Sequence, residues 1–183
     1  HNNGDLTFTN RAKDWGLGTP VHSNGSAYGD LDNDGDLDLV VNNVNAVSDI
    51  FENLSDRVYP DHHSMQIKLV GTGMNSRAIG SRVWLDLGDE IIYLEQMPIR
   101  GFESTVDAIL TAGVGKRDTL KSIRVVWPDQ KVTQLRNVPA DQLIELKWSE
   151  ATEIYSPVSA SNTPLFQKVP EKLKWQNQEN DFV

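Results

Sequence analysis

The sequence predicts an all-β protein in two parts, a meander of short strands over residues 1–57 and a compact β-sandwich or barrel over residues 58–149. Three observations predict this class. Short apolar runs are separated by turn residues, apolar and polar residues alternate within the runs of the second part, and no window keeps a helical period for more than a few turns. The composition, with 38% hydrophobic and 23% charged residues, is typical of a globular protein.

The first part is rich in turns, and its strands are expected between them. Turn signals stand at Asn2–Asp5, at Gly16–Gly18 and at Asn24–Gly25. Short strands at such close spacing are typical of a β-meander. The expected strands are LTFT, SAYGDL, LDLVVNN and DIFEN, at residues 6–9, 26–31, 37–43 and 49–53.

One loop of the meander concentrates negative charge, in the stretch GDLDNDGDLDLVV at residues 29–41. Two carboxylates ~5 Å apart repel by roughly 3 kcal/mol at an effective dielectric constant of ~20, so a hard divalent cation is expected to offset the repulsion. Calcium accepts about 6 to 8 oxygen ligands, and carboxylates spaced by two residues can converge on it. The aspartates at positions 1, 3, 5 and 9 of the loop are Asp30, Asp32, Asp34 and Asp38.

The other loop positions also suit calcium. Gly35, at position 6, permits the positive φ of a sharp turn around an ion. Asp36, at position 7, is expected to offer its backbone carbonyl and to point its side chain outward. Magnesium fits less well, because it keeps its waters. An EF-hand would need Glu at position 12, where Val41 stands, and flanking helices, so we expect a calcium loop in a β-hairpin. A solvated acidic turn without an ion is the alternative.

The second part alternates apolar and polar residues in six runs, and two turn signals predict hairpins. Gly88-Asp89 stands between one pair of runs and Pro128-Asp129-Gln130 between another. Residues 98–118 form a looser stretch. The six expected strands are residues 64–71, 81–88, 90–97, 122–129, 131–137 and 141–148. The expected core residues are Val83, Trp84, Leu85, Ile123, Val125, Trp127, Leu143, Ile144 and Leu146.

The last segment, residues 150–183, is expected to be a linker followed by the start of a further repeat. Its first half is rich in Ser, Thr and Pro, and apolar residues return in LFQKVPEKLKWQNQENDFV, residues 165–183. The chain begins without an initiator Met, so we expect a piece of a longer protein.

Composition excludes several classes of function. The net charge of −9 argues against a nucleic-acid partner, which requires clustered Lys and Arg. The absence of cysteine excludes disulfides, thiolate catalysis and cysteine-based zinc sites. No apolar run approaches the ~20 residues of a membrane-spanning helix.

No complete catalytic motif is present, and we expect no enzyme activity. Glu95 and Glu103 could in principle form a carboxylate pair of the glycosidase type, but two surface glutamates are the simpler interpretation. His62-His63 is expected to be a solvated pair rather than a metal site, because adjacent residues of a strand point to opposite faces. Trp15 and Trp175 are the tryptophans free to form sugar-stacking platforms.

The first part resembles one FG-GAP or VCBS-type repeat, the calcium-loop blade of integrin-type β-propellers. The resemblance rests on NNGDLTFTNRAKDWGLG and SNGSAYGDLDNDGDLDLVVNN, residues 2–18 and 23–43. A closed propeller needs ~4 to 8 blades, so the resemblance implies neighbouring blades in the full-length chain. The ligands that it implies are the side chains of Asp30, Asp32, Asp34 and Asp38 and the carbonyl of Asp36.

The second part resembles the ASPIC/UnbV domain of cartilage acidic proteins and their bacterial relatives. The resemblance rests on AIGSRVWL, residues 78–85, and on residues 101–138. The family pattern has a Gly-Ala-x-Val strand start, a Gly-x-Gly turn and a Val-x-Trp-Pro-Asp-Gly hairpin. Ser81 stands here for the alanine and Gln130 for the last glycine, which changes turn geometry only.

Together these observations predict a non-catalytic calcium-binding module of a larger exported or cell-surface protein, extracellular or periplasmic. The ion is expected to be structural, and the partner to be a protein or a glycan, as in adhesion. Two alternatives remain open. The chain could be an accessory module of a carbohydrate-active enzyme, or a purely architectural spacer.

Overall fold

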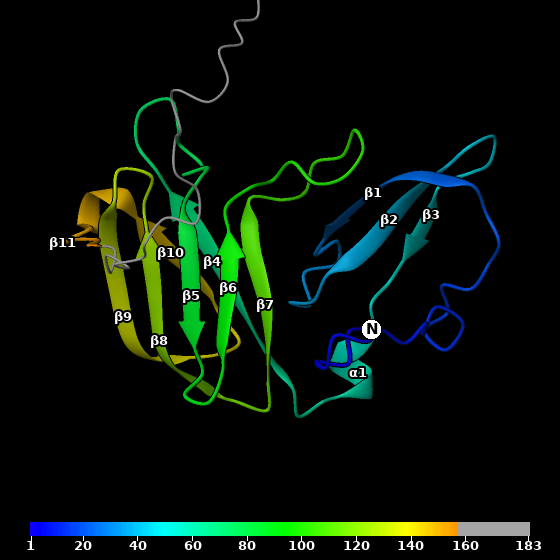
Figure 1. Ribbon diagram of the computed structural model, residues 1–183, viewed down its shortest axis with the longest axis horizontal. Helices are drawn as coiled ribbons and strands as arrows, with labels where there is room; N and C mark the ends of the chain where they lie inside the picture. The colour runs from blue at the N-terminus through cyan, green and yellow to red at the C-terminus, as the bar shows by residue number, and fades with distance from the viewer. Residues whose placement is uncertain (157–183) are drawn as a thin grey trace, which may run out of the picture.

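The computed structural model describes residues 1–156 and is nearly all β, as predicted. Figure 1 shows two parts, a small N-terminal sheet and a larger pair of sheets. The small sheet is an antiparallel meander in the order β1-β2-β3. Its elements are β1 (Ser23–Gly29), β2 (Asp38–Asn43), β3 (Asp49–Phe51) and the short helix α1 (Ser55–Val58) that follows.

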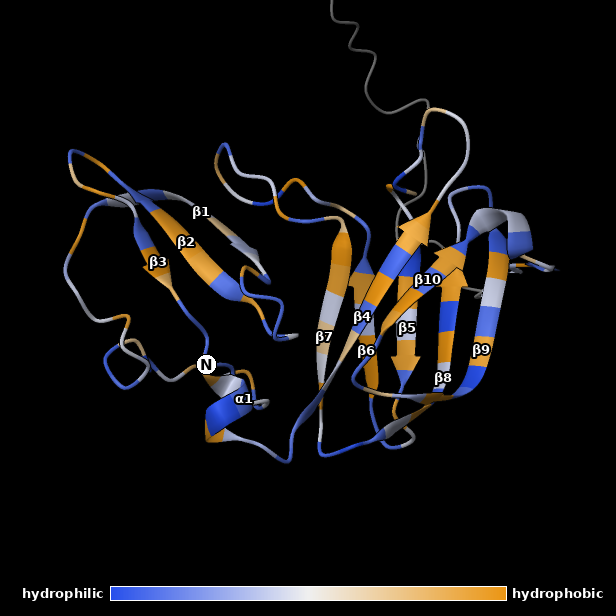
Figure 2. Ribbon diagram, turned by 180° about the vertical axis from the view of Figure 1, so that it is seen from behind, coloured by the Kyte–Doolittle hydropathy of each residue, from blue (hydrophilic) through white to orange (hydrophobic). Residues whose placement is uncertain are grey.

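The larger part is a two-layer β-sandwich. A three-stranded sheet in the order β10-β4-β7 lies behind a five-stranded sheet in the order β11-β9-β8-β5-β6, and neither sheet closes on itself (Figures 1 and 2). Of the two predicted forms, the sandwich is therefore the one observed. The strands are β4 (His63–Val70), β5 (Arg82–Asp86), β6 (Ile91–Glu95), β7 (Ile109–Gly115), β8 (Thr119–Val126), β9 (Lys131–Pro139), β10 (Leu143–Lys147) and β11 (Glu153–Ile154), with a 3-10 helix at Trp148–Glu150.

Both predicted hairpins are confirmed. Strands β5 and β6 pair antiparallel around the Gly88 turn, and β8 and β9 pair antiparallel around Asp129. The Asp129 carboxylate accepts the Lys131 N–H at 3.2 Å, as expected of a turn aspartate. Gln130 takes the positive φ of 68° that favours the glycine of the family pattern.

Three expectations about strands need correction. Residues 6–9 form only an isolated bridge between Asn2 and Phe8, because Leu6 and Phe8 lie 96% and 76% exposed and have no apolar surface to cover. The stretch at 98–118, expected to be loose, contains β7. Strand β11 pairs with β9 beyond the expected boundary at residue 149. The expected further repeat and Trp175 lie outside the described residues.

The core fills the space between the two sandwich sheets. Trp127 is 1% exposed, and its Nε1–H donates to Thr133 Oγ1 at 2.9 Å. Trp84 and Leu143 were wrongly expected in this core. Trp84 stands between Val83 and Leu85, so the pleat turns it to the opposite face, and Leu143 is 50% exposed. The buried hydrophobic cluster comprises Met65, Ile67, Leu69, Ala78, Val83, Leu85, Leu87, Ala112, Val114, Leu120, Ile123, Val125, Trp127, Val138 and Leu146.

The N-terminal part contributes nothing to that cluster, although the middle of β2 is the apolar run Leu39-Val40-Val41 (Figure 2). Its buried residues, among those described, are the polar Asp38 and Asn43, at 3% and 6% exposure. Asn43 donates to Val47 O at 3.0 Å and to Asp49 Oδ2 at 2.8 Å, and it accepts from Ser23 at 2.9 Å. Hydrogen bonds therefore hold this sheet together more than apolar burial does.

Ser81, which replaces the family alanine, generates a stability prediction. It is fully buried, and its hydroxyl has no hydrogen-bond partner among the described residues. An unpaired buried hydroxyl is destabilising, so Ser81→Ala should raise the free energy of unfolding by about 1 kcal/mol in a urea titration. The exposed Ser149→Ala serves as the control and should leave it unchanged. A loss of stability in Ser81→Ala would show that the hydroxyl is paired after all.

Candidate metal site at the aspartate loop

The aspartate loop closes the hairpin between β1 and β2. Gly29 pairs with Asp38 at its base, so residues 30–37 form the connection. Gly35 has a φ of 96°, as its place in the sequence predicted, and Asn33 also takes a positive φ of 64°. These two left-handed residues turn the chain back sharply enough to bring side chains from one short segment together.

Three of the four predicted side-chain ligands converge. Asp30, Asp32 and Asp34 each place a carboxylate oxygen so that the three oxygens lie within 4.8 Å of one another. Asp32 and Asp34 are exposed, whereas Asp30 is half-buried at the foot of the loop. The alternation of aspartate with another residue therefore produces the cluster that the sequence predicted.

Asp30 organises the loop backbone. Its Oδ1 accepts the Asp34 N–H at 3.1 Å, and its Oδ2 accepts the Gly35 N–H at 3.1 Å. Oδ2 also accepts a hydrogen bond from the Gln66 side-chain amide of β4, at 2.8 Å. A single carboxylate thus joins the start of the loop, its tip and the sandwich.

Asp38 is not a member of this group of three carboxylates. Its Oδ2 accepts the Leu31 N–H at 3.0 Å, and its Oδ1 accepts the Asn53 N–H at 2.8 Å. The buried carboxylate thereby ties the first turn of the loop to the chain that leaves β3. The spacing of the aspartates groups Asp38 with the expected ligands. It does not predict the hydrogen bond to Asn53, because Asn53 is 15 residues away in the sequence.

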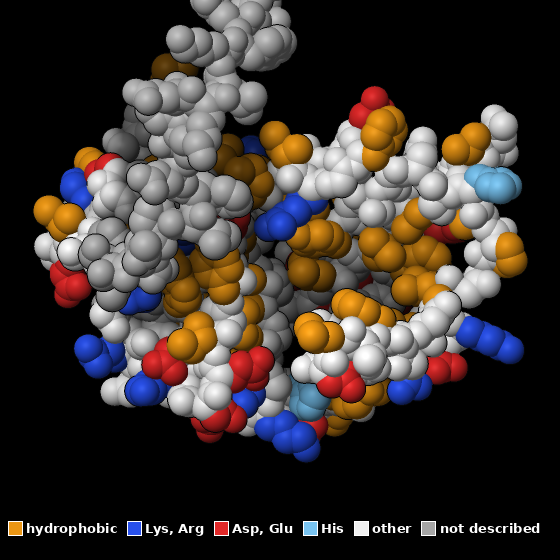
Figure 3. All heavy atoms as spheres, viewed as in Figure 1, with side chains coloured by type: hydrophobic (Ala, Val, Ile, Leu, Met, Phe, Trp, Pro, Cys, Tyr) orange, Lys and Arg blue, Asp and Glu red, His pale blue; other side chains and the backbone are white. Residues whose placement is uncertain are grey.

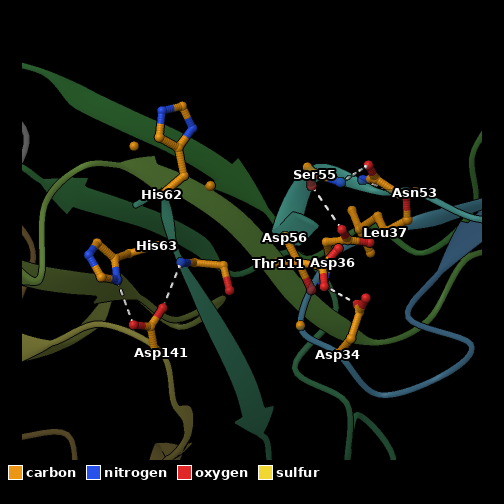
Figure 4. Close-up of a pocket in the computed structure, with 14 residues that line it drawn as sticks. Asp34, Asp36, Leu37, Asn53, Ser55, Asp56, His62, His63, Thr111 and Asp141 are labelled. Carbon is orange, nitrogen blue, oxygen red and sulfur yellow. Dashed lines mark hydrogen bonds and ion pairs between the residues drawn. The ribbon is translucent and has the colours of Figure 1, made fainter. Parts of the chain in front are cut away.

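Asp36 does not point outward, and that expectation is wrong. Its Oδ2 accepts the Ser55 hydroxyl at 2.8 Å, because helix α1 begins beside the loop and turns Ser55 toward it (Figure 4). Its Oδ1 is buried and has no hydrogen-bond donor among the described residues. Asp34, Asp36 and Asp56 form a second group of carboxylates with oxygens within 4.8 Å. Asp56 was missed, because it follows β3 and carries no spacing signal.

The electrostatics of the loop disfavour full ionisation. Desolvation, followed by the charge of Asp34, raises the pKa of Asp32. Desolvation is also the largest cause that raises the pKa of Asp36; the Ser55 hydrogen bond opposes it, and the charges of Asp34 and Asp38 add to it. Both carboxyls therefore hold their protons more tightly in the folded chain than in the unfolded one.

A pocket of about 400 Å³ lies between the loop and the sandwich. Figure 4 shows the carboxylates of Asp34, Asp36 and Asp56 on one side of it, and His62, His63 and Asp141 on the other. His63 Nδ1 contacts Asp141 Oδ2 at 2.6 Å, and Asp141 Oδ1 accepts the Ser64 N–H at 3.1 Å. Burial acts to raise the pKa of Asp141, but these two hydrogen bonds outweigh it and lower that pKa. His62 instead stacks on Tyr59 with ring centroids 5.0 Å apart. The two histidines thus make different contacts, but they are not the solvated pair on opposite faces that was expected, because both line this pocket and only His63 belongs to β4.

The other candidate residues do not form a site together. Glu95 and Glu103 line two different pockets. Trp15 is 60% exposed and meets the edge of the His1 ring at 6.1 Å between centroids.

The donor set of the loop fits a hard cation. All its side-chain donors are carboxylate oxygens, which calcium prefers over the nitrogen and sulfur ligands of softer metals. The orphaned Asp36 Oδ1 is a buried acceptor that a cation could satisfy. A divalent ion would offset the charges of Asp34 and Asp38, which add to desolvation in raising the pKa of Asp32 and of Asp36.

One family model matches most of the sandwich. Residues 71–153 match the family model described as ASPIC and UnbV, so this part of the chain carries an ASPIC/UnbV domain. The match begins after β4 and ends within β11; it does not include the aspartate loop. No curated protein matches the chain. Among residues 1–156, no helix is both long and apolar enough to cross a membrane.

The raised pKa values predict how stability without metal depends on pH. Because the pKa of Asp32 is raised by folding, its stabilising contribution is full below the aspartate pKa of the unfolded chain, about 4, and is lost as pH rises through the folded value. Asp32→Asn should therefore melt at a higher temperature than wild type in chelator at pH 7, and this difference should shrink toward pH 4. Thermal melts across that range measure it.

The control is Asp118→Asn, which removes one exposed charge in the turn between β7 and β8. It should show no comparable difference. Equal melting of wild type and Asp32→Asn at pH 7 would mean that the ionised Asp32 does not destabilise the loop.

Proposed function

We propose that this chain is a non-catalytic calcium-binding module of a larger exported or cell-surface protein, and that the ion is structural. The observation that carries the proposal is the convergence of the Asp30, Asp32 and Asp34 carboxylates within 4.8 Å. The cluster belongs to a part of the chain that adds no residue to the main apolar core. A loop that is costly to ionise and has little apolar support needs a cation to hold its shape.

The side chains of Asp30, Asp32 and Asp34 would hold the ion. The FG-GAP/VCBS resemblance adds Asp38 and the carbonyl of Asp36 to this set, whereas the second carboxylate group offers Asp56 beside Asp34. Bound calcium supplies positive charge that offsets the repulsion among these carboxylates. Extracellular modules bind calcium at roughly 10⁻⁴–10⁻³ M, so a weak site suffices in calcium-rich surroundings.

The resemblance also supports a propeller-blade role for the N-terminal part. The meander β1-β2-β3 has the connectivity of consecutive strands of a blade. Val47 and Ile50 are 87% and 69% exposed, and neighbouring blades of a longer chain would cover such side chains. The assembled protein would bind a protein or a glycan, as in adhesion.

An accessory role in a carbohydrate-active protein is the second candidate. Trp15, 60% exposed, is the observation that favours it, since an exposed indole can stack on a sugar ring. Loss of binding to a glycan array in Trp15→Ala, with unchanged melting, would support this candidate, whereas equal binding would exclude Trp15 as the platform.

A thermal melt tests calcium binding. For a Kd of about 0.1 mM, 1 mM calcium should stabilise the folded chain by about 1.4 kcal/mol. This corresponds to a rise in Tm of about 3 to 6 °C over the value in excess chelator. Magnesium at 1 mM should give a much smaller rise. No rise with calcium would overturn the proposal for this chain.

Substitution in the loop should remove the response. Asp34→Ala should abolish most of the calcium-dependent rise, because Asp34 belongs to both carboxylate groups. In chelator it should not lower the melting temperature, because it also removes a charge that raises the pKa of Asp32 and of Asp36. Asp118→Ala, the matched control, should keep the full rise. Equal damage by Asp34→Ala with calcium and in chelator would mean that the loop is not a metal site.

A further inference from the structure

Gln66 lies on the outer face of the three-stranded sheet. Strand β4 alternates strictly, and Met65 and Ile67 on either side of Gln66 are 0% exposed in the core. The pleat therefore turns Gln66 away from the core, toward the aspartate loop. Backbone pairing fixes its position, because Gln66 lies opposite Thr111 of β7 and Leu143 of β10.

From this position Gln66 reaches the first predicted metal ligand. Its Nε2 donates to Asp30 Oδ2 at 2.8 Å, over a separation of 36 residues. Oδ2 also accepts the Gly35 N–H, and Oδ1 accepts the Asp34 N–H. A carboxylate has about four lone-pair sites, so these three donors leave one site, on Oδ1, for a cation.

Two further close approaches join the parts. A Cβ on Gly35 would lie 3.3 Å from Ser64 Oγ, so the tip of the loop rests against the start of β4. A Cβ on Gly25 of β1 would lie 3.3 Å from Phe102 O and from Ser104 Oγ, in the loop between β6 and β7. Figure 1 shows this loop extending toward β1.

Between these contacts the seam is hollow and partly apolar. A pocket of about 180 Å³ is lined by Tyr28 and Leu37 from the N-terminal part and by Leu94 and Leu110 from the sandwich. Figure 3 shows hydrophobic side chains on both sides of the hollow between the two parts. The seam is loosely filled, and the direct contacts across it include the Gln66–Asp30 hydrogen bond and the close approaches of Gly35 and Gly25.

We propose that Gln66 is a positioning residue for Asp30, so that the ASPIC/UnbV-bearing sandwich completes the metal site of the N-terminal part. This inference rests on the calcium binding proposed above. The Gln66 amide holds the Asp30 carboxylate in one orientation, with its free site directed to the ion. By linkage, calcium binding in turn strengthens the contact between the loop and β4.

The expected loss of calcium affinity on removing Gln66 can be estimated from other metal sites. Loss of a hydrogen-bond partner that orients a ligand costs about 10- to 100-fold in metal affinity. Gln66→Met keeps the length of the side chain and removes the donor. It should raise the half-saturating calcium concentration, measured from Tm across a calcium series, at least about tenfold. Gln66→Asn, too short to reach Asp30, should do the same.

Amide hydrogen exchange distinguishes a residue that positions the metal ligand from one that only stabilises the fold. Loss of a purely stabilising residue would not change which segments respond to calcium. In wild type, calcium should slow amide exchange both in residues 29–38 and at the outer end of β4, near Ser64 and Gln66. In Gln66→Met at saturating calcium, only residues 29–38 should respond. The matched control, Gln134→Met on the exposed face of β9, should behave as wild type in both measurements.

The outcomes separate this inference from the proposed function. An absent calcium response in wild type overturns the calcium proposal, and this inference with it. A normal response in wild type and in both Gln66 variants overturns this inference alone. A Gln66→Met protein that melts lower in chelator but keeps the wild-type half-saturating concentration marks Gln66 as merely structural, which also overturns it.

Discussion

The carboxylate of Asp30 joins the aspartate loop to the sandwich through a hydrogen bond from Gln66. It accepts two backbone N–H groups of its own loop and one side-chain amide from the sandwich. It also stands in a cluster with Asp32 and Asp34, where desolvation and the charge of Asp34 raise the pKa of Asp32. The same group thus shapes the loop, attaches it to β4 and contributes to the repulsion that a cation would relieve.

The two parts are stabilised by different means. The sandwich buries a continuous apolar cluster between two sheets, as a domain of this size must. The N-terminal sheet instead buries Asp38 and Asn43 and satisfies them with hydrogen bonds. A small three-stranded sheet with little apolar burial is marginal in isolation. The contacts between the two parts, and the proposed ion, therefore contribute more to the stability of the N-terminal sheet than to that of the sandwich.

The sequence predicted what depends on local pattern. Alternation placed β4, β5 and β8, turn residues placed both hairpins, and regular spacing brought Asp30, Asp32 and Asp34 together. The sequence-based prediction failed where the burial of a residue depends on which face of the sheet its side chain occupies. Trp84 was assigned to the core although its two neighbours occupy that face.

Other features depended on contacts distant in sequence. Strand β7 was missed because Gly113 and Gly115 were interpreted as a Gly-x-Gly turn, although Leu110, Ala112 and Val114 alternate as a strand requires. The roles of Asp56 and Gln66 could not be predicted, because both meet the aspartate loop only after the chain has folded back on itself. The spacing of residues within a motif predicts ligands that come from that segment. It cannot predict residues of other segments that contact the motif in the folded chain.

A calcium titration followed by amide NMR would test the central claim most directly. The account predicts saturable shifts of the Gly35 and Asp36 backbone amides and of the Gln66 side-chain amide, all with one midpoint, because all three lie around the aspartate cluster. Shifts that never saturate, or that leave these three groups unmoved, would contradict a calcium site at this loop. Saturation at Gly35 and Asp36 without a response at Gln66 would contradict its link to the sandwich.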